Sequence, residues 1–411
     1  MELTKRQAIF LVIICLMANK VQRLPSLIST AVGRHGWLAF AVMGFIDIVF
    51  LIVTLNFNKK AKGLTTYEVC EKAGGKWFAK LTYIGLGIYF LLNSLLPYEA
   101  IHDLFANILF DNLSWEIYSI LLALAVFFIS SRGLKNLGRL GELYFYIIGV
   151  SFIILLTLGA VTTNYYHVLP LYDINGSAFI ETCLKYNLWF GDFLMIYMFV
   201  GKIKVDKNNL GWPCVVVFAS VVVLISFSYA VFYGLYENLS TNQNNLISAI
   251  SQFSLVGLDI GRVDWFLVLF FQISTLISSS VYLFLTSECI KEVFGLKKNT
   301  FICFILAAIV YSMDILIFKS VQAGAGIVAE VSQYFSLFMI IGFPIIMFIS
   351  VLVKEKKNNK KFKKIPENYS KFSFLIKRNP KLHIFKKNQL KKQENKKIPS
   401  KLKEVTYEEN N

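Results

Sequence analysis

Two basic residues and a proline interrupt the first long apolar run of the sequence. Lys20, Arg23 and Pro25 follow the run AIFLVII, in the stretch CLMANKVQRLPSLIS. The two cations are three residues apart, so a helix that continued here would present them as neighbours. Pro25 has no backbone donor and disfavours helix at the residue before it. The stretch therefore combines a charged pair with a predicted helix break.

Charges inside an apolar run need partners, because an isolated one costs at least about 2.5–3.5 kcal/mol at the centre of a bilayer. Candidate acidic partners within other apolar runs are Asp47, Glu99, Asp103 and Asp192. Asp192 follows Gly191 in NLWFGDFLMIYMF, where the glycine weakens the helix. We therefore expect Lys20 or Arg23 to pair with Asp192.

Two interpretations of this pair stay open. Discontinuous helices at matching places in the two halves of a transporter free backbone groups to hold a small polar ligand near the bilayer midplane. Alternatively, Lys20 and Arg23 snorkel or form a structural ion pair, and Gly191 permits close helix packing. The first interpretation predicts a ligand site, and the second predicts none.

The elements that position these residues are predicted to be membrane-spanning helices. Of 411 residues, 56% are hydrophobic and 17% charged, and ten apolar segments are long enough to consider as spans. They are 8–31, 36–56, 79–110, 115–131, 141–161, 181–201, 211–235, 263–286, 301–319 and 330–353. Lipid leaves the backbone no other hydrogen-bond partner, so the fold class is an all-α polytopic membrane protein. The proposed breaks fall in the first and sixth segments, the same place in each half of five.

Loops between the segments predict the orientation. Lys and Arg concentrate in alternate loops, which places those loops and both termini in the cytoplasm. The first segment follows MELTKRQ without a small-residue cleavage site, so we expect the N-terminus to be retained. Short helices are expected within TTYEVCEKAGGKWFAK and between Glu237 and Arg262. In the loop SRGLKNLGRLGE, Arg139 and Glu142 are spaced to form a pair within one helix.

The C-terminal tail carries most of the net charge of +16. Residues 354–411 hold 19 Lys or Arg against 6 Asp or Glu, a net +13, which leaves +3 for residues 1–353. We therefore predict two domains, a transmembrane domain of residues 1–353 and a Lys-rich cytoplasmic tail of residues 354–411. Aromatic residues among the lysines favour an anionic membrane surface as its partner over nucleic acid, and a solvated, disordered tail is the alternative.

Enzyme chemistry finds little support in the sequence. Six scattered cysteines form no CxxC pair, and four histidines lie at no metal-ligand spacing. The sequence contains no HExxH, GxSxG or paired-aspartate motif. We therefore predict no catalytic residues, no metal and no cofactor.

Several sequence stretches that contain polar residues between the apolar segments resemble those of a known family. LTKRQAIFLVII, GLTTYEVCEKAGGKW, SSRGLKNLGRLGELYF and SSSVYLFLTSECIKEVFGLKK, with the ten-helix plan, resemble the B subunit of GerA-type spore germinant receptors. The resemblance covers residues 1 to about 353. Gly191-Asp192 is similar to a glycine-acid pair in the family's sixth helix. Leu24-Pro25 departs from the family, because ANKVQR precedes it in place of a small, uncharged motif.

This resemblance implies a fold, a function and partners. The fold would be the LeuT-like five-plus-five inverted repeat of the amino acid–polyamine–organocation superfamily, with broken helices one and six. The protein would lie in the spore inner membrane with A-type and C-type receptor subunits and sense a small nutrient such as an amino acid. The alternative is an autonomous amino-acid or cation transporter of the same superfamily. The expected ligand-binding residues are Ala18, Asn19, Lys20, Arg23, Asn93, Tyr98, Glu99, Gly191, Asp192, Thr275, Ser278 and Ser279.

Overall fold

The computed structural model describes most of the chain. The described residues are 3–22, 24–61, 63–104, 115–169, 174–203, 211–243, 245–255, 264–296, 299–319 and 332–363. The chain divides into two compact units, Met1–Leu352 and Val353–Asn411, and each is described by itself. The second unit is described only as far as residue 363, so most of the predicted basic tail lies outside the described residues.

The regular structure of the described residues is helical, apart from one isolated bridge between Leu3 and Ile203. Seven described stretches are long and apolar enough to cross a membrane: Leu24–Ala61, Lys76–Tyr98, Leu134–Thr162, Gly211–Tyr236, Phe271–Phe294, Asn299–Leu316 and Ser332–Lys354. Glu116–Ser131 is a shorter apolar helix. The all-α membrane class is confirmed, while the count of ten spans stays a prediction.

The first predicted segment consists of two helices. α1 (Lys5–Lys20) begins after Thr4, whose hydroxyl accepts a hydrogen bond from the Gln7 backbone while the Gln7 side chain bonds back to Thr4. Val21 and Gln22 form a turn. α2 (Leu24–Val32) then carries Pro25 in its first turn, where the missing N–H removes no helical hydrogen bond.

The helices up to residue 162 follow the predicted segments closely. They are η1 (Gly33–His35), α3 (Gly36–Ala61), α4 (Thr66–Gly74), α5 (Lys76–Leu104), α6 (Trp115–Ser131) and α7 (Leu134–Thr162). α4 confirms the short helix expected in the loop after the second segment. Its first turn is closed by a capping box between Thr65 and Glu68.

The predicted segment 181–201 is divided into short pieces. η3 (Tyr165–His167) precedes α8 (Gly176–Lys185), η4 (Asn187–Trp189), η5 (Asp192–Leu194) and α9 (Met195–Phe199). Phe190 and Gly191, between η4 and η5, are not helical. This interruption contains the Gly191-Asp192 pair that the sequence singled out.

The last helices include the second expected loop helix. They are α10 (Gly211–Tyr236), η6 (Glu237–Asn242), α11 (Leu246–Leu255), α12 (Asp264–Phe294), α13 (Asn299–Lys319), η7 (Phe338–Gly342, a π-helix) and α15 (Phe343–Lys363). α11 confirms the helix expected between Glu237 and Arg262.

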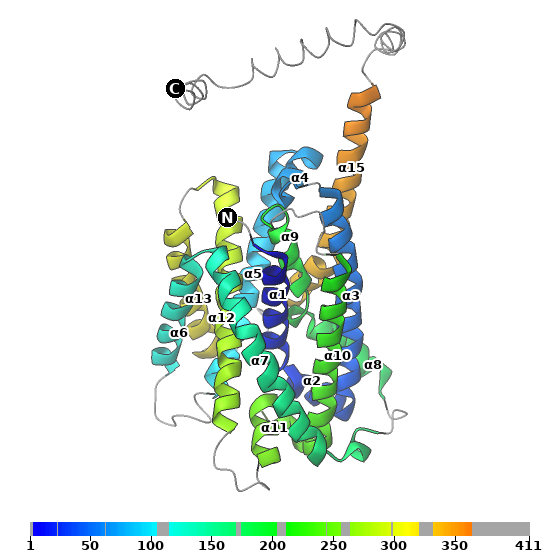
Figure 1. Ribbon diagram of the computed structural model, residues 1–411, viewed down its shortest axis with the longest axis vertical. Helices are drawn as coiled ribbons and strands as arrows, with labels where there is room; N and C mark the ends of the chain where they lie inside the picture. Colours follow the sequence, from blue (N-terminus) through cyan, green and yellow to red (C-terminus); the bar gives the residue numbers. More distant parts are fainter. Residues whose placement is uncertain are drawn as a thin grey trace, which may run out of the picture. The chain divides into compact units, whose positions relative to one another are not determined.

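Helix α1 lies at the centre of the first unit. It packs against α12, α7, α10 and α9, while α12 packs along α5 and α10 along α3 (Figure 1). Every residue of α1 from Leu11 to Lys20 is buried, which explains why the run from Ala8 to Ala18 is apolar on all faces of the helix. The polar residues that end α1 are therefore held inside the unit rather than at its surface.

Candidate functional site

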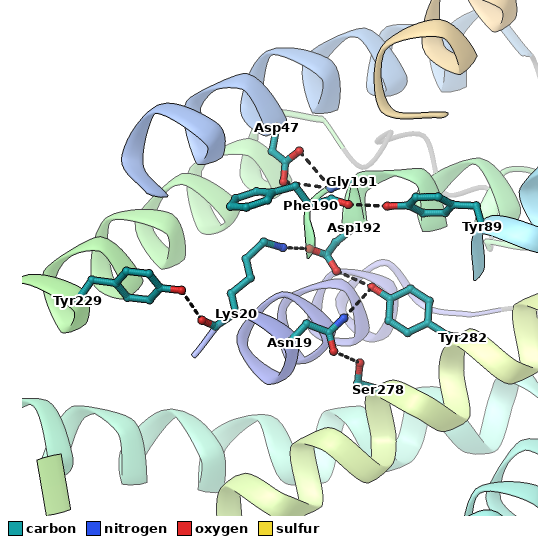
Figure 2. A network of polar contacts seen from close by, with 10 residues as sticks. All are labelled: Asn19, Lys20, Asp47, Tyr89, Phe190, Gly191, Asp192, Tyr229, Ser278 and Tyr282. Atoms are coloured by element: carbon teal, nitrogen blue, oxygen red, sulfur yellow. Dashed lines mark hydrogen bonds and ion pairs between the residues drawn. The ribbon is translucent and has the colours of Figure 1, made fainter. Parts of the chain in front are cut away.

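A buried ion pair joins the two interrupted segments. The ammonium of Lys20, the last residue of α1, binds Asp192 Oδ2 at the start of η5 (Figure 2). The side chain of Lys20 is 0% exposed and that of Asp192 is 2% exposed. The pairing expected from the sequence is confirmed for Lys20. Arg23 lies outside the described residues.

Hydrogen bonds from other elements reach backbone carbonyl groups at the end of α1, in the turn that follows it and in the first turn of α2. Tyr229 on α10 donates to the Lys20 carbonyl over 2.5 Å, and Tyr233 donates to the Pro25 carbonyl over 2.7 Å. The Gln22 carbonyl accepts from the backbone of Leu246, at the start of α11, over 3.0 Å. Because orphan backbone groups are expensive in an apolar interior, these contacts stabilise the interruption.

Gly191 gives the second interruption its shape. Its φ of +91° is left-handed, and a Cβ there would lie 2.5 Å from the Tyr89 hydroxyl and 2.8 Å from Ile340. The Gly191 N–H donates to both carboxylate oxygens of Asp47, over 3.2 and 3.3 Å. The Tyr89 hydroxyl donates to the Phe190 carbonyl. Only glycine fits this conformation and this close approach.

A polar network extends from Asp192 to α12. The Tyr282 hydroxyl donates to Asp192 Oδ1 over 2.5 Å, and the Asn19 amide donates to that hydroxyl over 3.4 Å (Figure 2). Ser278 Oγ in turn donates to Asn19 Oδ1 over 3.4 Å. The two interrupted segments and α12 are thereby joined through side chains.

The Lys20 ammonium lies among acidic and aromatic groups. Lys20 is the cation, and the buried carboxyl groups of Asp192 and Asp47 both interact with it electrostatically. The Lys20 ammonium also lies 4.9 Å from the centroid of the Phe190 ring. A carboxylate and an aromatic face together form a setting that stabilises an ammonium group.

The other predicted site residues make contacts other than those with Lys20 and Asp192. Ala18 is buried on α1. Asn93 donates to the Tyr89 carbonyl over 3.0 Å, Thr275 to the Gln272 carbonyl over 2.6 Å, and Ser279 to the Ser94 carbonyl over 3.0 Å. Tyr98 lies in a separate apolar cluster of α5, α6, α12 and α13. The side chain of Glu99 is outside the described part of the chain. A ligand-binding role for these residues stays a prediction.

Five residues of the network are absent from the set predicted to bind ligand: Asp47, Tyr89, Phe190, Tyr229 and Tyr282. Tyr282 had a sequence signal, because it lies one helical turn after Ser278 and on the same face. Asp47 was recognised as a buried acid, but its partner is a backbone N–H that no side-chain pattern indicates.

Two further polar clusters lie away from this network. Glu288 on α12 binds Lys202 after α9 over 2.5 Å, Lys291 over 3.1 Å, and Asn299 of α13. Glu142 on α7 binds Arg6, and it accepts from the Gln7 amide over 3.0 Å. The expected pair of Arg139 with Glu142 is therefore wrong for the described residues, because Glu142 faces α1 instead of its own helix.

Comparisons with known sequences give one family match and one curated relative here. A family model described as "Spore germination protein" matches residues 2–323. Spore germination protein A2 of Bacillus subtilis (strain 168) is 20% identical over 370 residues, covering 88% of this chain and 98% of the relative.

The fold is similar to that of solved transporters. A mutant manganese transporter of Eremococcus coleocola has a TM-score of 0.57 at 9% identity, covering 84% of this chain and 78% of the transporter. A Na⁺-coupled sialic acid symporter has a TM-score of 0.56 at 10% identity, with the same shares covered. Both are LeuT-fold transporters, so the chain shares that general fold.

Proposed function

Because the chain belongs to the spore germination protein family, we propose that it is the B-type membrane subunit of a spore germinant receptor. In this proposal it senses a small polar nutrient between the end of α1 and the interruption at Gly191, and helps to trigger germination. A multi-pass membrane protein of this family, with a transporter fold, is suited to binding rather than to enzyme chemistry.

The observation that carries the proposal is the Lys20–Asp192 ion pair at two helix interruptions. Intramembrane charges are expensive and mark ligand or ion pathways by default. Backbone groups at such interruptions serve as ligand contacts in inverted-repeat transporters. We propose that α1–α2 and α8–α9 are the broken helices one and six of a ten-helix, five-plus-five inverted repeat.

The proposed assembly follows from the family. A-type and C-type receptor subunits are the proposed partners, in the spore inner membrane, with both termini in the cytoplasm. Nucleic acid is not a proposed partner. We propose that the Lys-rich residues 354–411 bind anionic lipid. The test compares the binding of the full chain and of a variant ending at residue 353 to anionic and to neutral vesicles. Equal binding of both proteins to anionic vesicles at low salt would contradict this role.

The second candidate function is an autonomous transporter of an amino acid or a cation. The similarity of the fold to solved transporters favours it. Solute uptake by the purified chain alone in liposomes, with normal germination of spores that lack the gene, would support the transporter and remove the receptor role.

Spores carrying Asp192→Ala test the receptor function. We expect the nutrient response that depends on this chain to be lost while spore assembly proceeds. Asp314→Asn is the matched control, because Asp314 is also a buried acid but lies on α13, where it accepts a hydrogen bond from Ser119. An unchanged response in Asp192→Ala spores, at wild-type abundance of the protein, would contradict the proposed site.

A further inference from the structure

The groups around the Lys20 ammonium form a subsite for a cation. The Asp192 carboxylate binds the ammonium directly, the Phe190 ring centroid lies 4.9 Å away, and Asp47 interacts with the ammonium electrostatically. Asp192 and Asp47 are 2% and 1% exposed. Carboxylates and an aromatic face, shielded from water, are the groups with which proteins bind ammonium ligands.

The occupant of this subsite is supplied by the chain itself. Lys20 is the last residue of α1, and its side chain crosses from there to η5 with 0% exposure. A separate ammonium ligand would have to displace the Lys20 ammonium from Asp192. That exchange would leave a buried lysine charge without its carboxylate, which is strongly unfavourable.

Resting on the proposed function, we propose that Lys20 is a built-in occupant of an ammonium subsite made by Asp192 and Phe190, and that the molecule sensed here carries no free ammonium group. The ligand class is therefore small uncharged or anionic polar compounds. Free amines and amino acids would bind only after the Lys20 side chain is removed.

Chemical rescue tests the subsite. Lys20→Ala removes three carbons and the ammonium, the atoms of n-propylammonium. We expect n-propylammonium chloride to raise the unfolding midpoint of the full-length Lys20→Ala protein in detergent by about 2 °C or more, saturably. n-Propanol, which has the same chain length without the charge, should give a smaller rise, and potassium chloride at equal ionic strength controls for salt.

Two proteins control for unspecific effects. Wild type has its subsite filled, and the Lys20→Ala/Asp192→Asn double variant lacks the carboxylate, so n-propylammonium should stabilise neither. If Lys20→Ala unfolds on extraction, the folded yield from membranes solubilised with and without n-propylammonium replaces the midpoint as the readout. No rise and no gain in yield, or an equal effect on the double variant, would overturn the subsite.

A matched pair of probes tests the ligand class. L-alaninamide and L-lactamide differ only in carrying an ammonium or a hydroxyl group. L-alaninamide should stabilise Lys20→Ala but not wild type, and stabilisation of wild type by L-alaninamide beyond that by L-lactamide would overturn the inference. These measurements use no spores, so their failure would leave the receptor role standing. An intact response in Asp192→Ala spores would instead contradict the proposed sensing site, without deciding whether Lys20 fills an ammonium subsite.

Discussion

The Tyr282 hydroxyl lies 2.5 Å from Asp192 Oδ1 and donates a hydrogen bond to it. The same hydroxyl accepts a hydrogen bond from the Asn19 amide over 3.4 Å. One side chain of α12 therefore connects the end of α1 to the interruption before α9, and Tyr282 orients the carboxylate that binds Lys20. Replacing Tyr282 by phenylalanine would remove this hydroxyl and keep the ring that packs against apolar neighbours.

Tyr282→Phe should destabilise the protein. The change removes a hydrogen bond to an ionised group in a buried setting, so we expect a loss of about 1.5–3 kcal/mol in the free energy of unfolding. The measurement is the unfolding midpoint of the purified protein in detergent. The response of spores should also weaken, because Asp192 loses a group that holds its orientation.

Tyr98→Phe is the matched control. Tyr98 is 2% exposed, and within the described part of the chain its hydroxyl has no hydrogen-bond partner. Removing that hydroxyl should therefore leave stability unchanged or raise it slightly. Equal losses in the two variants would argue against a special role for the Tyr282 hydroxyl.

The Lys20–Asp192 pair should show strong coupling in a double-mutant cycle. Asp192→Asn alone leaves the buried Lys20 charge uncompensated and should lower the free energy of unfolding by about 3–5 kcal/mol. Lys20→Met removes that charge, so the double variant should be more stable than the sum of the single losses by at least about 1 kcal/mol. Additive losses in the unfolding midpoints would contradict a direct interaction.

The Glu288 cluster should stabilise the end of α12. Glu288→Ala removes contacts to Lys202, Lys291 and Asn299. We expect a loss of about 2–3 kcal/mol in the free energy of unfolding, because Glu288 is 8% exposed and its hydrogen bonds are charged. Denaturant or thermal unfolding of the purified variant provides the measurement.

Lys291→Ala separates this cluster from an ordinary surface pair. Lys291 is 33% exposed and lies three residues from Glu288 on the same helix. Such a pair contributes about 0.5 kcal/mol or less. If Lys291→Ala were as damaging as Glu288→Ala, the link from Glu288 to Lys202 and α13 would not be the source of the stability.

Sequence patterns predicted the parts of the fold that depend on local chemistry. Charges within apolar runs identified Lys20 and Asp192, and the opposite charges predicted their pairing. The Leu24-Pro25 pair and Gly191 identified where helix would be weak. These features are local, so a single sequence is enough to find them.

Contacts that depend on tertiary packing were not predictable in the same way. Glu142 was spaced to pair with Arg139, but the orientation of α7 turns it toward Arg6 and Gln7. Asp47 binds the Gly191 backbone, a donor that every residue except proline carries. Tyr229 binds the Lys20 carbonyl only because α10 packs beside the end of α1.

Gln22 should be a position where stability and response change in opposite directions. It lies in the turn between α1 and α2 and is 1% exposed. Among the described residues, neither its amide nitrogen nor its amide oxygen has a hydrogen-bond partner. A buried amide without partners costs about 1–3 kcal/mol, so Gln22→Met, which keeps the side-chain length, should raise the unfolding midpoint.

The same substitution should weaken the nutrient response of spores, since the carboxamide offers a donor and an acceptor for an uncharged ligand beside the proposed site. Gln272→Met is the matched control. Gln272 is also buried, at 9% exposure, but its Oε1 accepts a hydrogen bond from Thr275 over 3.2 Å. Gln272→Met should therefore lower the midpoint by removing a satisfied contact. A less stable Gln22→Met protein, or a more stable one with a full response, would show that the Gln22 amide is not held for a ligand.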